Sequence, residues 1–306
     1  MGESESRGAG KVNGPGASVV IRCYNEERHL PELFEALRIQ SFQDFEVVVV
    51  DSGSTDRTLE IVRGEDVNLL YINKEDFSFG RSLNMGCASA KGEFLVFVSA
   101  HCIPTGPEWL WNLLDDFSDP KVASVYGKQR GVEGSHFSEQ QIFRRWFPEE
   151  SVSHQDGPFC NNANCAIRRS LWEEFPYDEE LTGLEDVAWA NQVTRHGWWV
   201  NYRADAAVTH IHHESPNQIR HRYEREAITF QKVFPNEHFN SWDMVRLIFQ
   251  NVWEDWKQAR LQGVWRREWF SIVRFRVAQF SGTYQGFHTR RPSPSELKKR
   301  FYYPEK

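Results

Sequence analysis

The stretch FEVVVVDSGSTDRTLEIVRG, residues 45–64, contains the repeating unit from which the fold can be predicted. Its first part, up to Asp51, is an unbroken apolar run, which is typical of a strand buried on both faces of a sheet. Its second part, from residue 54 on, predicts a capped helix that ends at Gly64. Buried strands that alternate with helices build parallel sheets, so this stretch predicts an α/β protein.

The same strand–helix unit recurs through the first 127 residues. The pattern predicts strands at 17–23, 45–51, 67–72, 94–99 and 121–127, and helices at 30–41, 54–64, 78–92 and 107–117. The chain has no Gly-x-Gly-x-x-Gly after the first strand and no Gly-x-x-x-x-Gly-Lys-Ser/Thr anywhere, so dinucleotide-binding and P-loop folds lose their main support. We expect a mainly parallel sheet flanked by helices.

The second half of the chain is less regular. Residues 128–165 are rich in Gly, Ser, His and Asn, as loops that receive an acceptor often are. Residues 182–197 predict a helix with Thr182 as its cap, and residues 198–213 predict two strands joined by a turn. From about residue 215 onward the pattern is helical, with interleaved Trp and Arg.

Composition sets limits on the class of protein. No apolar run of the 306 residues approaches the roughly 18 needed to cross a bilayer. The five cysteines form no Cys-x-x-Cys pair, which favours reduced, buried thiols in a cytosolic protein. The net charge is −7, yet residues 241–306 hold 13 Lys and Arg against 6 Asp and Glu, together with five of the twelve Trp. A basic, Trp-rich end on an acidic body indicates an anionic surface as partner and argues against nucleic acid.

Five short motifs follow one another along the chain. They are VVIRCYNEE (19–27), VVVVDSGSTDRT (47–58), RSLNMGCASAKGEFLVFVSAH (81–101), GLEDVAWA (183–190) and AVTHIHH (207–213). In this order they resemble the family 2 glycosyltransferases, which have the GT-A fold. The last motif is similar to a His-x-His segment of several rhamnosyltransferase-like bacterial polysaccharide transferases.

The resemblance divides the chain into three parts. It implies a disordered tail at residues 1–16, a GT-A nucleotide-diphospho-sugar transferase domain at 17–235, and a C-terminal helical extension at 236–306. The aromatic residues of this extension could form the core of a helical subdomain. They could equally place a helix at a membrane interface, where Trp and Arg meet lipid headgroups.

The resemblance also implies donor-binding residues at the ends of the strands, where ligands of such sheets bind. Tyr24 would lie against the nucleobase, and Arg81 would approach the ribose or diphosphate. Asp51 would accept a hydrogen bond from a uracil-type imide, or it would only close the turn that follows its strand. The implied donor-binding set is Tyr24, Asn25, Glu26, Asp51, Arg81, Asn84, Ser99 and Ala100.

Two adjacent acids, Glu185 and Asp186, are the implied catalytic pair. Acids at a predicted helix start are favoured by the helix dipole, so capping alone could explain them. Chemistry favours a functional role, because an acceptor hydroxyl must lose its proton as it attacks the anomeric carbon. We expect Asp186 to be the general base and Glu185 to position the acceptor. The asparagines at 161–164 could bind acceptor hydroxyls or form a polar turn.

The family's Asp-x-Asp metal motif is replaced by Ser99-Ala100-His101 in the stretch FLVFVSAHCIP, residues 94–104. His210 and His212 are two apart on a predicted strand and should face the same side. With His101 they could form an imidazole-rich site for a divalent metal. Imidazole suits transition ions better than magnesium, so we expect manganese. The alternatives are polar surface histidines, or His and Arg that neutralise the diphosphate without metal.

The resemblance implies an inverting glycosyltransferase. It would move a sugar from a UDP- or dTDP-sugar to a hydroxyl of a glycan or lipid-linked glycan in surface polysaccharide synthesis. It would act in the cytoplasm, at the inner face of the plasma membrane. Two alternatives stay open: a metal-independent transferase with the same base, and a non-catalytic scaffold that binds nucleotide sugars.

Overall fold

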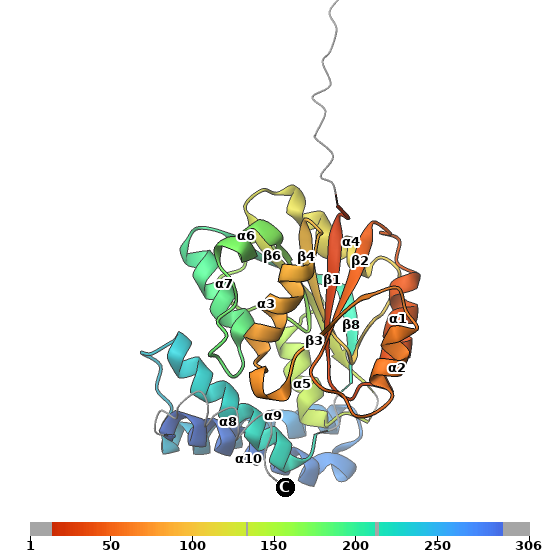
Figure 1. The fold of residues 1–306 in the computed structure, drawn as a ribbon. Helices are drawn as coiled ribbons and strands as arrows, with labels where there is room; N and C mark the ends of the chain where they lie inside the picture. The colour runs from red at the N-terminus through yellow and green to blue at the C-terminus, as the bar shows by residue number, and fades with distance from the viewer. Residues whose placement is uncertain (1–13, 133, 212–213, 290–306) are drawn as a thin grey trace, which may run out of the picture.

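One mixed sheet of eight strands forms the centre of the protein in a computed structural model that describes residues 14–132, 134–211 and 214–289 (Figure 1). The strand order is β3-β2-β1-β4-β7-β6-β8-β5. The strands are β1 (Ala17–Cys23), β2 (Phe45–Asp51), β3 (Asn68–Tyr71), β4 (Phe94–Ser99), β5 (Cys102–Pro104), β6 (Val122–Gly131), β7 (Asn164–Arg168) and β8 (Trp199–His210).

The sheet is mostly parallel, as the sequence predicts. β1 pairs in parallel with β2 and β4, β2 with β3, and β6 with β8. β7 is inserted antiparallel between β4 and β6, and the short β5 runs antiparallel to β8. The strands β1, β2, β3 and β4 therefore all end at the same side of the sheet, which we call the carboxyl edge.

Helices cover both faces of the sheet, because successive residues of each buried strand point to opposite sides. Val19 and Ile21 of β1 face a core shared with α1 and α4, whereas Val20 faces a core shared with α3, α6 and α7. The helices of this part are α1 (Leu30–Arg38), α2 (Thr58–Arg63), α3 (Phe79–Ser89), α4 (Trp109–Leu114), α5 (Phe137–Trp146), α6 (Arg169–Glu174) and α7 (Glu185–Arg195), with 3₁₀ turns η1 (Lys74–Asp76) and η2 (Asp115–Ser118).

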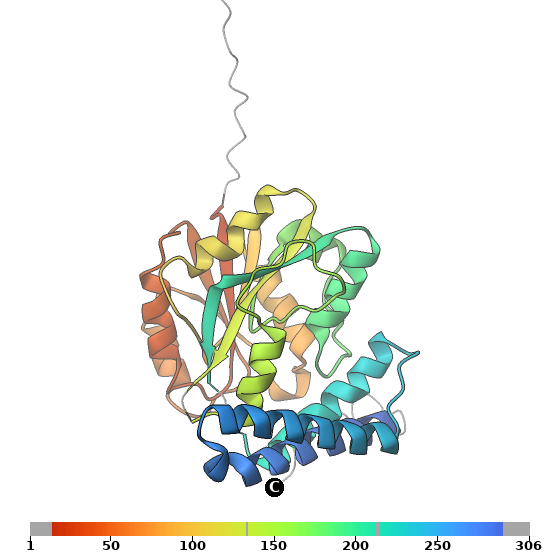
Figure 2. The same ribbon diagram turned by 180° about the vertical axis from the view of Figure 1, so that it is seen from behind.

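Three long helices form a layer across the end of the sheet toward which β1 runs (Figures 1 and 2). They are α8 (Pro216–Val233), α9 (Ser241–Leu261) and α10 (Trp265–His288). α10 packs between α8 and α9, and α5 connects the layer to the sheet. α9 and α10 are joined by a buried ion pair in which the Arg276 guanidinium donates to both carboxylate oxygens of Asp255, at 2.8 and 2.9 Å. Because α8 belongs to this layer, the layer begins before residue 236, where the C-terminal extension was predicted to start.

Two local predictions were wrong. α7 begins at Glu185 after Leu184, which has a φ of 52°, and the hydroxyl of the expected cap Thr182 bonds that of Thr229 instead. The expected strand–turn–strand at 198–213 is the single strand β8 as far as His210. A register shift against β6 explains the difference, because a bulge takes up the polar residues that suggested a turn.

The expectations from composition concern the cysteines and the long helices. All five cysteines are buried and free. Within the described ranges, no helix is both long enough and apolar enough to pass through a bilayer. Residues 1–13 of the predicted N-terminal tail lie outside those ranges.

Candidate active site

The loops after β1 and β2 are joined at the carboxyl edge by Asn25. Its backbone N–H donates to Ser54 Oγ at 2.9 Å, and its side-chain Oδ1 accepts from the backbone N–H of Thr55 at 2.8 Å. Asn25 adopts a φ of 58°, a left-handed conformation that Asn tolerates better than most residues. Asn25 therefore holds the two loops together.

Asp51 closes the turn after β2. Its Oδ1 accepts from the backbone N–H groups of Gly53 and Ser54, at 2.9 and 3.1 Å, and its side chain is buried. Gly53 has a φ of +89°, which this turn requires and which glycine adopts without strain. Of the two roles weighed for Asp51, the geometry supports the turn-closing one.

Tyr24 forms an exposed platform beside this turn. Its side chain is 43% exposed, and its hydroxyl accepts from Lys74 Nζ at 3.1 Å. The Lys74 stem lies against Gly53, so Tyr24, Lys74 and the turn form one surface. An exposed aromatic ring next to a cation can receive a planar, anionic ligand such as a nucleotide.

His101, Glu26 and His210 meet at the end of β4. His101 Nδ1 lies 2.8 Å from Glu26 Oε1, and the rings of His101 and His210 stack with their centroids 5.1 Å apart. The pairing of Cys102 with His210 between β5 and β8 brings the two imidazoles together. His210 is buried, with Nδ1 2.6 Å from Gln129 Oε1.

These residues fit a metal only in part. A carboxylate that holds one ring nitrogen of a histidine is the usual support of a metal-binding imidazole, and Glu26 holds His101 in this way. However, in the portion of the chain that the structure describes, no three His, Cys, Asp or Glu side chains are placed so that together they could hold a metal ion. His212, the third predicted ligand, lies outside that portion.

Asp186 is held at the start of α7 by two backbone donors. Its Oδ2 accepts from the N–H of Asn162 at 3.0 Å, and its Oδ1 accepts from the N–H of Val187 at 2.8 Å. The neighbouring residue Glu185 is buried, and its Oε1 lies 3.4 Å from an Arg22 guanidinium nitrogen. Since Arg22 pairs in the sheet with Ser99, both acids lie at the same edge as the β4 end.

The surroundings of Asp186 raise the pKa of its carboxyl group from 3.8 to about 7. Desolvation by burial is the largest cause, and the negative charge of Glu185 adds to it. The two backbone donors and Arg22 act in the opposite direction. A carboxylate with a pKa near neutrality can both accept a proton and hold it, as a general base requires.

Two arginines lie on the Phe79 ring next to this acid pair. The Arg22 guanidinium is 5.1 Å from the ring centroid, and that of Arg225, on α8, is 5.0 Å from it. Arg225 also lies against Gly183, just before α7. Phe79 and Arg225 were missed from sequence, because neither belongs to a recognisable motif and α8 packs here only in three dimensions.

Some predicted residues do not join the site through their side chains. The side-chain amide of Asn84 makes four hydrogen bonds to residues 172–179 and so holds that segment in place. Arg81 pairs with Asp76 and Glu179, at 3.6 and 3.7 Å. Ala100 is buried, so it contributes only a methyl group to the core.

The polar run at 161–164 is mainly structural. Asn164 is buried and bonds the Trp109 ring and the carbonyls of Lys128 and Ala206. Asn162 provides the backbone donor to Asp186, so this turn positions the predicted base.

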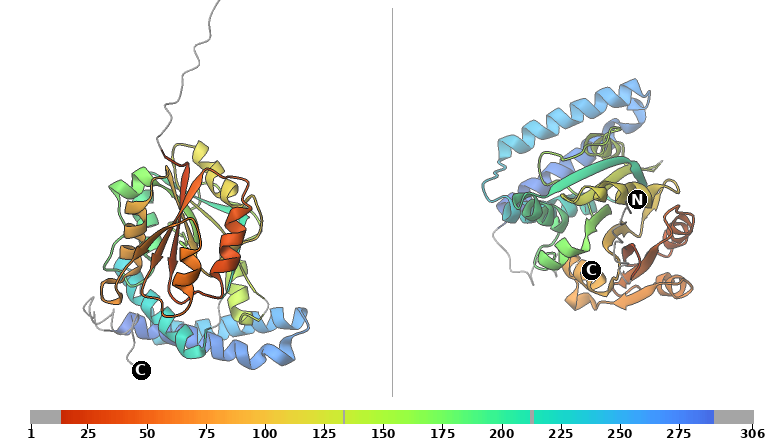
Figure 3. Two further views of the ribbon diagram at one scale, coloured as in Figure 1. Left: turned by 45° about the vertical axis from the view of Figure 1, so that its right-hand side comes forward. Right: turned by 90° about the horizontal axis from the view of Figure 1, so that it is seen from above.

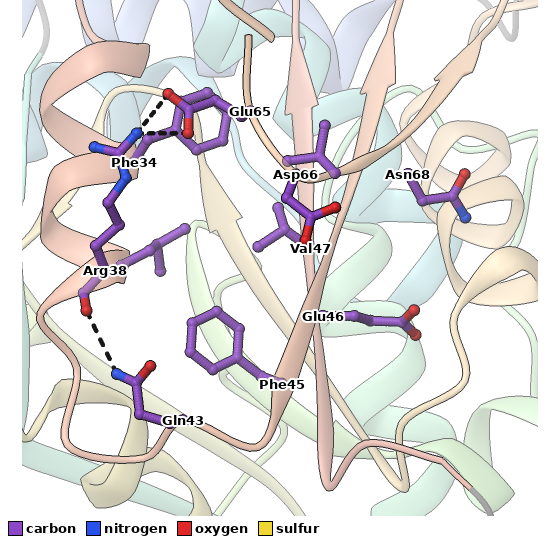
Figure 4. Close-up of a pocket in the computed structure, with 11 residues that line it drawn as sticks. Phe34, Arg38, Gln43, Phe45, Glu46, Val47, Glu65, Asp66 and Asn68 are labelled. Atoms are coloured by element: carbon purple, nitrogen blue, oxygen red, sulfur yellow. Dashed lines mark hydrogen bonds and ion pairs between the residues drawn. The ribbon is translucent and has the colours of Figure 1, made fainter. Parts of the chain in front are cut away.

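A hollow of about 570 Å³ lies elsewhere, between α1 and the start of β2 (Figure 4). Phe34 of α1 and Phe45 line it, and the Arg38 guanidinium pairs with Glu65 at its rim. Phe45 is the first residue of β2 and Asp51 the last, so this hollow lies roughly 20 Å from the carboxyl edge, at about 3.3 Å per residue. We place the functional site at the carboxyl edge.

Solved structures share this architecture. The mannosyltransferase PcManGT of Pyrobaculum calidifontis, in complex with GDP-Man and Mn²⁺, matches with a TM-score of 0.62 and 18% identity, covering 90% of this chain and 88% of that one. TarS 1–349 of S. aureus, in complex with UDP-GlcNAc, matches with a TM-score of 0.52 and 19% identity over 86% of this chain and 90% of that one. The fold is that of the GT-A glycosyltransferases, as predicted.

The chain belongs to glycosyl transferase family 2, whose sequence profile matches residues 18–175. The O-antigen chain rhamnosyltransferase RfbN of Salmonella typhimurium is 27% identical over 219 residues, 67% of this chain and 69% of RfbN. The poly(ribitol-phosphate) β-N-acetylglucosaminyltransferase TarS of Staphylococcus aureus is 40% identical over 177 residues, 55% of this chain and 30% of TarS. The predicted family and enzyme class are confirmed: the protein is a glycosyltransferase.

Proposed function

We propose that this glycosyltransferase moves a sugar from a UDP- or dTDP-sugar to a hydroxyl of a glycan or lipid-linked glycan in surface polysaccharide synthesis, with inversion. The observation that carries the proposal is Asp186, a half-buried carboxylate with a pKa near neutrality at the carboxyl edge. The names of the relatives support the pathway, since RfbN is an O-antigen chain rhamnosyltransferase.

The proposed reaction is a single displacement at the anomeric carbon. The acceptor oxygen forms a bond to this carbon on the face opposite the nucleotide, while the bond to the diphosphate oxygen breaks. Asp186 takes the acceptor proton, and the electron pair of the broken bond leaves with the nucleoside diphosphate. Attack from the opposite face inverts the anomeric configuration. Glu185, fixed by Arg22, keeps the pKa of Asp186 high and orients the acceptor.

Donor binding is assigned to the remaining groups at the carboxyl edge. Tyr24 would lie against the nucleobase, while Asn25 and Asp51 hold the two loops in shape. Arg22 and Arg225 would face the diphosphate, whose negative charge grows as the bond to the sugar breaks. Complexes of fold neighbours with UDP-GlcNAc and GDP-Man support a nucleotide sugar as donor.

A divalent metal, most suitably manganese, remains part of the proposal. His101, oriented by Glu26, would be its protein ligand, with His210 and His212 as the other candidates. When bound, the metal would act as a Lewis acid on the diphosphate. The alternative is a metal-independent transferase in which His101 and the two arginines neutralise the diphosphate themselves.

The proposal also covers the acceptor site and the location of the enzyme. Residues 128–165 would shape the acceptor site beside Asp186, and residues 17–235 would form the transferase domain. A lipid-linked acceptor would place the enzyme in the cytoplasm, at the inner face of the plasma membrane. Nucleic acid has no role in this proposal.

The test is a screen of UDP-, dTDP- and GDP-sugars with the purified full-length chain, with and without Mn²⁺. Nucleoside diphosphate release and thermal stabilisation are measured for each donor. We expect release, stimulated by acceptor glycan, from at least one UDP- or dTDP-sugar. Stabilisation by a nucleotide sugar without any release would instead favour the non-catalytic scaffold, which the missing Asp-x-Asp motif suggests. Preference for GDP-sugars would contradict the proposed donor class.

A further inference from the structure

The outer face of α9 carries a stripe of exposed apolar side chains. The stripe is Trp242, Val245, Phe249 and Trp253, with 71%, 38%, 72% and 58% of their surfaces exposed. Their spacing of three, four and four residues places them on one side of the helix. α9 is the outermost helix of the C-terminal layer, as the views from behind and from above show (Figures 2 and 3). α9 has 21 residues and is therefore about 31 Å long.

The stripe continues onto α10 through an apolar groove. Phe249, Trp253 and Trp256 of α9 line the groove with Val273 of α10. The Trp256 indole N–H donates to the carbonyl oxygen of Trp269 at 3.2 Å, which fixes the two helices at this point. Beyond the groove, Trp269 and Phe270 are 47% and 54% exposed. We call the surface made by Trp242, Val245, Phe249, Trp253, Trp269 and Phe270 the α9–α10 face.

Cations surround the α9–α10 face. They are the exposed side chains of Arg246, Lys257, Arg260, Arg266 and Arg274. The Arg274 guanidinium lies 5.7 Å from the Phe270 ring centroid, and that of Arg260 lies 5.0 Å from the Trp265 ring centroid.

The acids of the two helices cancel only part of this positive charge. Asp255 is buried in its pair with Arg276, and Glu268 pairs with Arg267. Asp243 pairs with Arg246 at 3.7 Å, and Glu254 pairs with Lys257 at 3.3 Å. Arg260, Arg266 and Arg274 therefore supply the positive charge at the face. The face therefore presents aromatic side chains bordered by positive charge.

We propose that the α9–α10 face binds an anionic lipid bilayer. Helices that lie in the headgroup region combine Trp and Phe on one side with Arg and Lys beside them, and anionic lipids attract the cations. A second copy of this chain fits less well, because a twofold contact through this face would bring two basic borders together. The face thus matches a negatively charged partner that accepts aromatic rings.

This docking deepens the proposed function by supplying a reason for a lipid-linked acceptor, and that part rests on the proposed function. The same helical layer reaches the catalytic residues through α8. Arg225 of α8 lies on Phe79 beside the acid pair, and Thr229 of α8 bonds Thr182 just before α7. A protein docked through α9 and α10 would therefore hold its active site close to acceptors anchored in the bilayer.

The test is flotation of the full-length chain with vesicles of phosphatidylcholine alone or with added phosphatidylglycerol. We expect binding to the anionic vesicles, weaker binding to the neutral ones, and a loss of binding at high salt. The triple variant Trp242→Ser, Phe249→Ser, Trp253→Ser should bind at least about tenfold more weakly, because each ring contributes buried apolar area. These side chains are exposed, so its melting temperature should not fall.

A control variant and a charge-reversal variant test whether binding depends on the α9–α10 face and on its positive charge. Trp111→Ser removes a Trp of α4 that is 49% exposed, far from the layer, and should float like the wild type. Replacing Arg246, Arg260 and Arg266 by Glu should abolish the preference for anionic vesicles. Nucleoside diphosphate release without vesicles should be unchanged in every variant, so failed docking is distinguishable from failed catalysis. The proposal is overturned if the wild type floats with neither vesicle, if the triple variant floats like the wild type, or if the face instead mediates a concentration-dependent dimer.

Discussion

Asp186→Asn should reduce sugar transfer by about a thousandfold, within the range of general-base contributions. Asparagine has almost the same shape and its amide oxygen can still accept one of the two backbone hydrogen bonds, from the N–H of Asn162 or of Val187, yet it cannot take the acceptor proton at neutral pH. Donor binding should persist, because none of the groups assigned to the nucleotide is altered. The measurements are initial rates of transfer and thermal stabilisation by the donor.

The same substitution should make the folded protein more stable above pH 7. In the unfolded chain an aspartate ionises near pH 3.8, whereas in the folded protein the pKa of Asp186 is about 7. Between these values the folded state holds a proton that the unfolded state has lost, so this group's contribution to stability falls as pH rises and is lowest above pH 7. Asparagine does not titrate. The melting temperature of the Asp186→Asn variant should therefore exceed that of the wild type at alkaline pH, and the two should differ less near pH 4.

Asp66→Asn is the matched control, because this aspartate is exposed on the loop before β3. It should leave both the rate and the melting temperatures unchanged. Transfer by Asp186→Asn within a few-fold of the wild type would remove Asp186 from the role of base. Lost transfer with a lowered melting temperature at every pH would indicate a structural role instead.

His101→Ala should lower the rate of transfer by at least about a hundredfold, because even the groups that only support a metal ligand contribute about ten- to a hundredfold. A chelator should reduce turnover of the wild type, and Mn²⁺ should restore it better than Mg²⁺, because imidazole prefers transition ions. His101→Asp replaces the ring with an oxygen ligand and should shift the preference toward Mg²⁺. Initial rates with each ion, after chelation, measure these effects.

His196→Ala is the control for this series, since His196 is exposed at the end of α7. It should behave as the wild type with every ion. Full turnover of the wild type in chelator would contradict the metal and favour the metal-independent transferase. If His101→Ala were also fully active, His101 would have no part in diphosphate stabilisation.

Local sequence signals were enough for the parallel half of the fold. The strands at 17–23, 45–51 and 94–99 were predicted with the bounds that the structure shows. A short run of apolar residues between polar ends is typical of a buried strand, and the polar residues mark where it begins and ends. The antiparallel strands were not recognised. β5 has only three residues, and β7 begins within a polar turn, so neither has a pattern of its own.

The site was predictable as a set of chain positions but not as a set of contacts. The motifs identified Glu26, His101 and Asp186, yet nothing in the sequence indicates that Glu26 holds the His101 ring. That His101 stacks on His210 depends on the pairing of β5 with β8, which is remote in sequence. Arg225 reaches Phe79 only because α8 folds back onto the carboxyl edge.

The central claim, that Asp186 is the base, is tested most directly by the pH dependence of kcat/KM for transfer. The wild type should gain activity as pH rises through about 7, where the Asp186 carboxyl group loses its proton. Glu185→Gln removes a charge that raises the pKa of Asp186, so the rise should move to lower pH in this variant. A rate that does not change through this range, or a rise that Glu185→Gln leaves in place, would contradict the account.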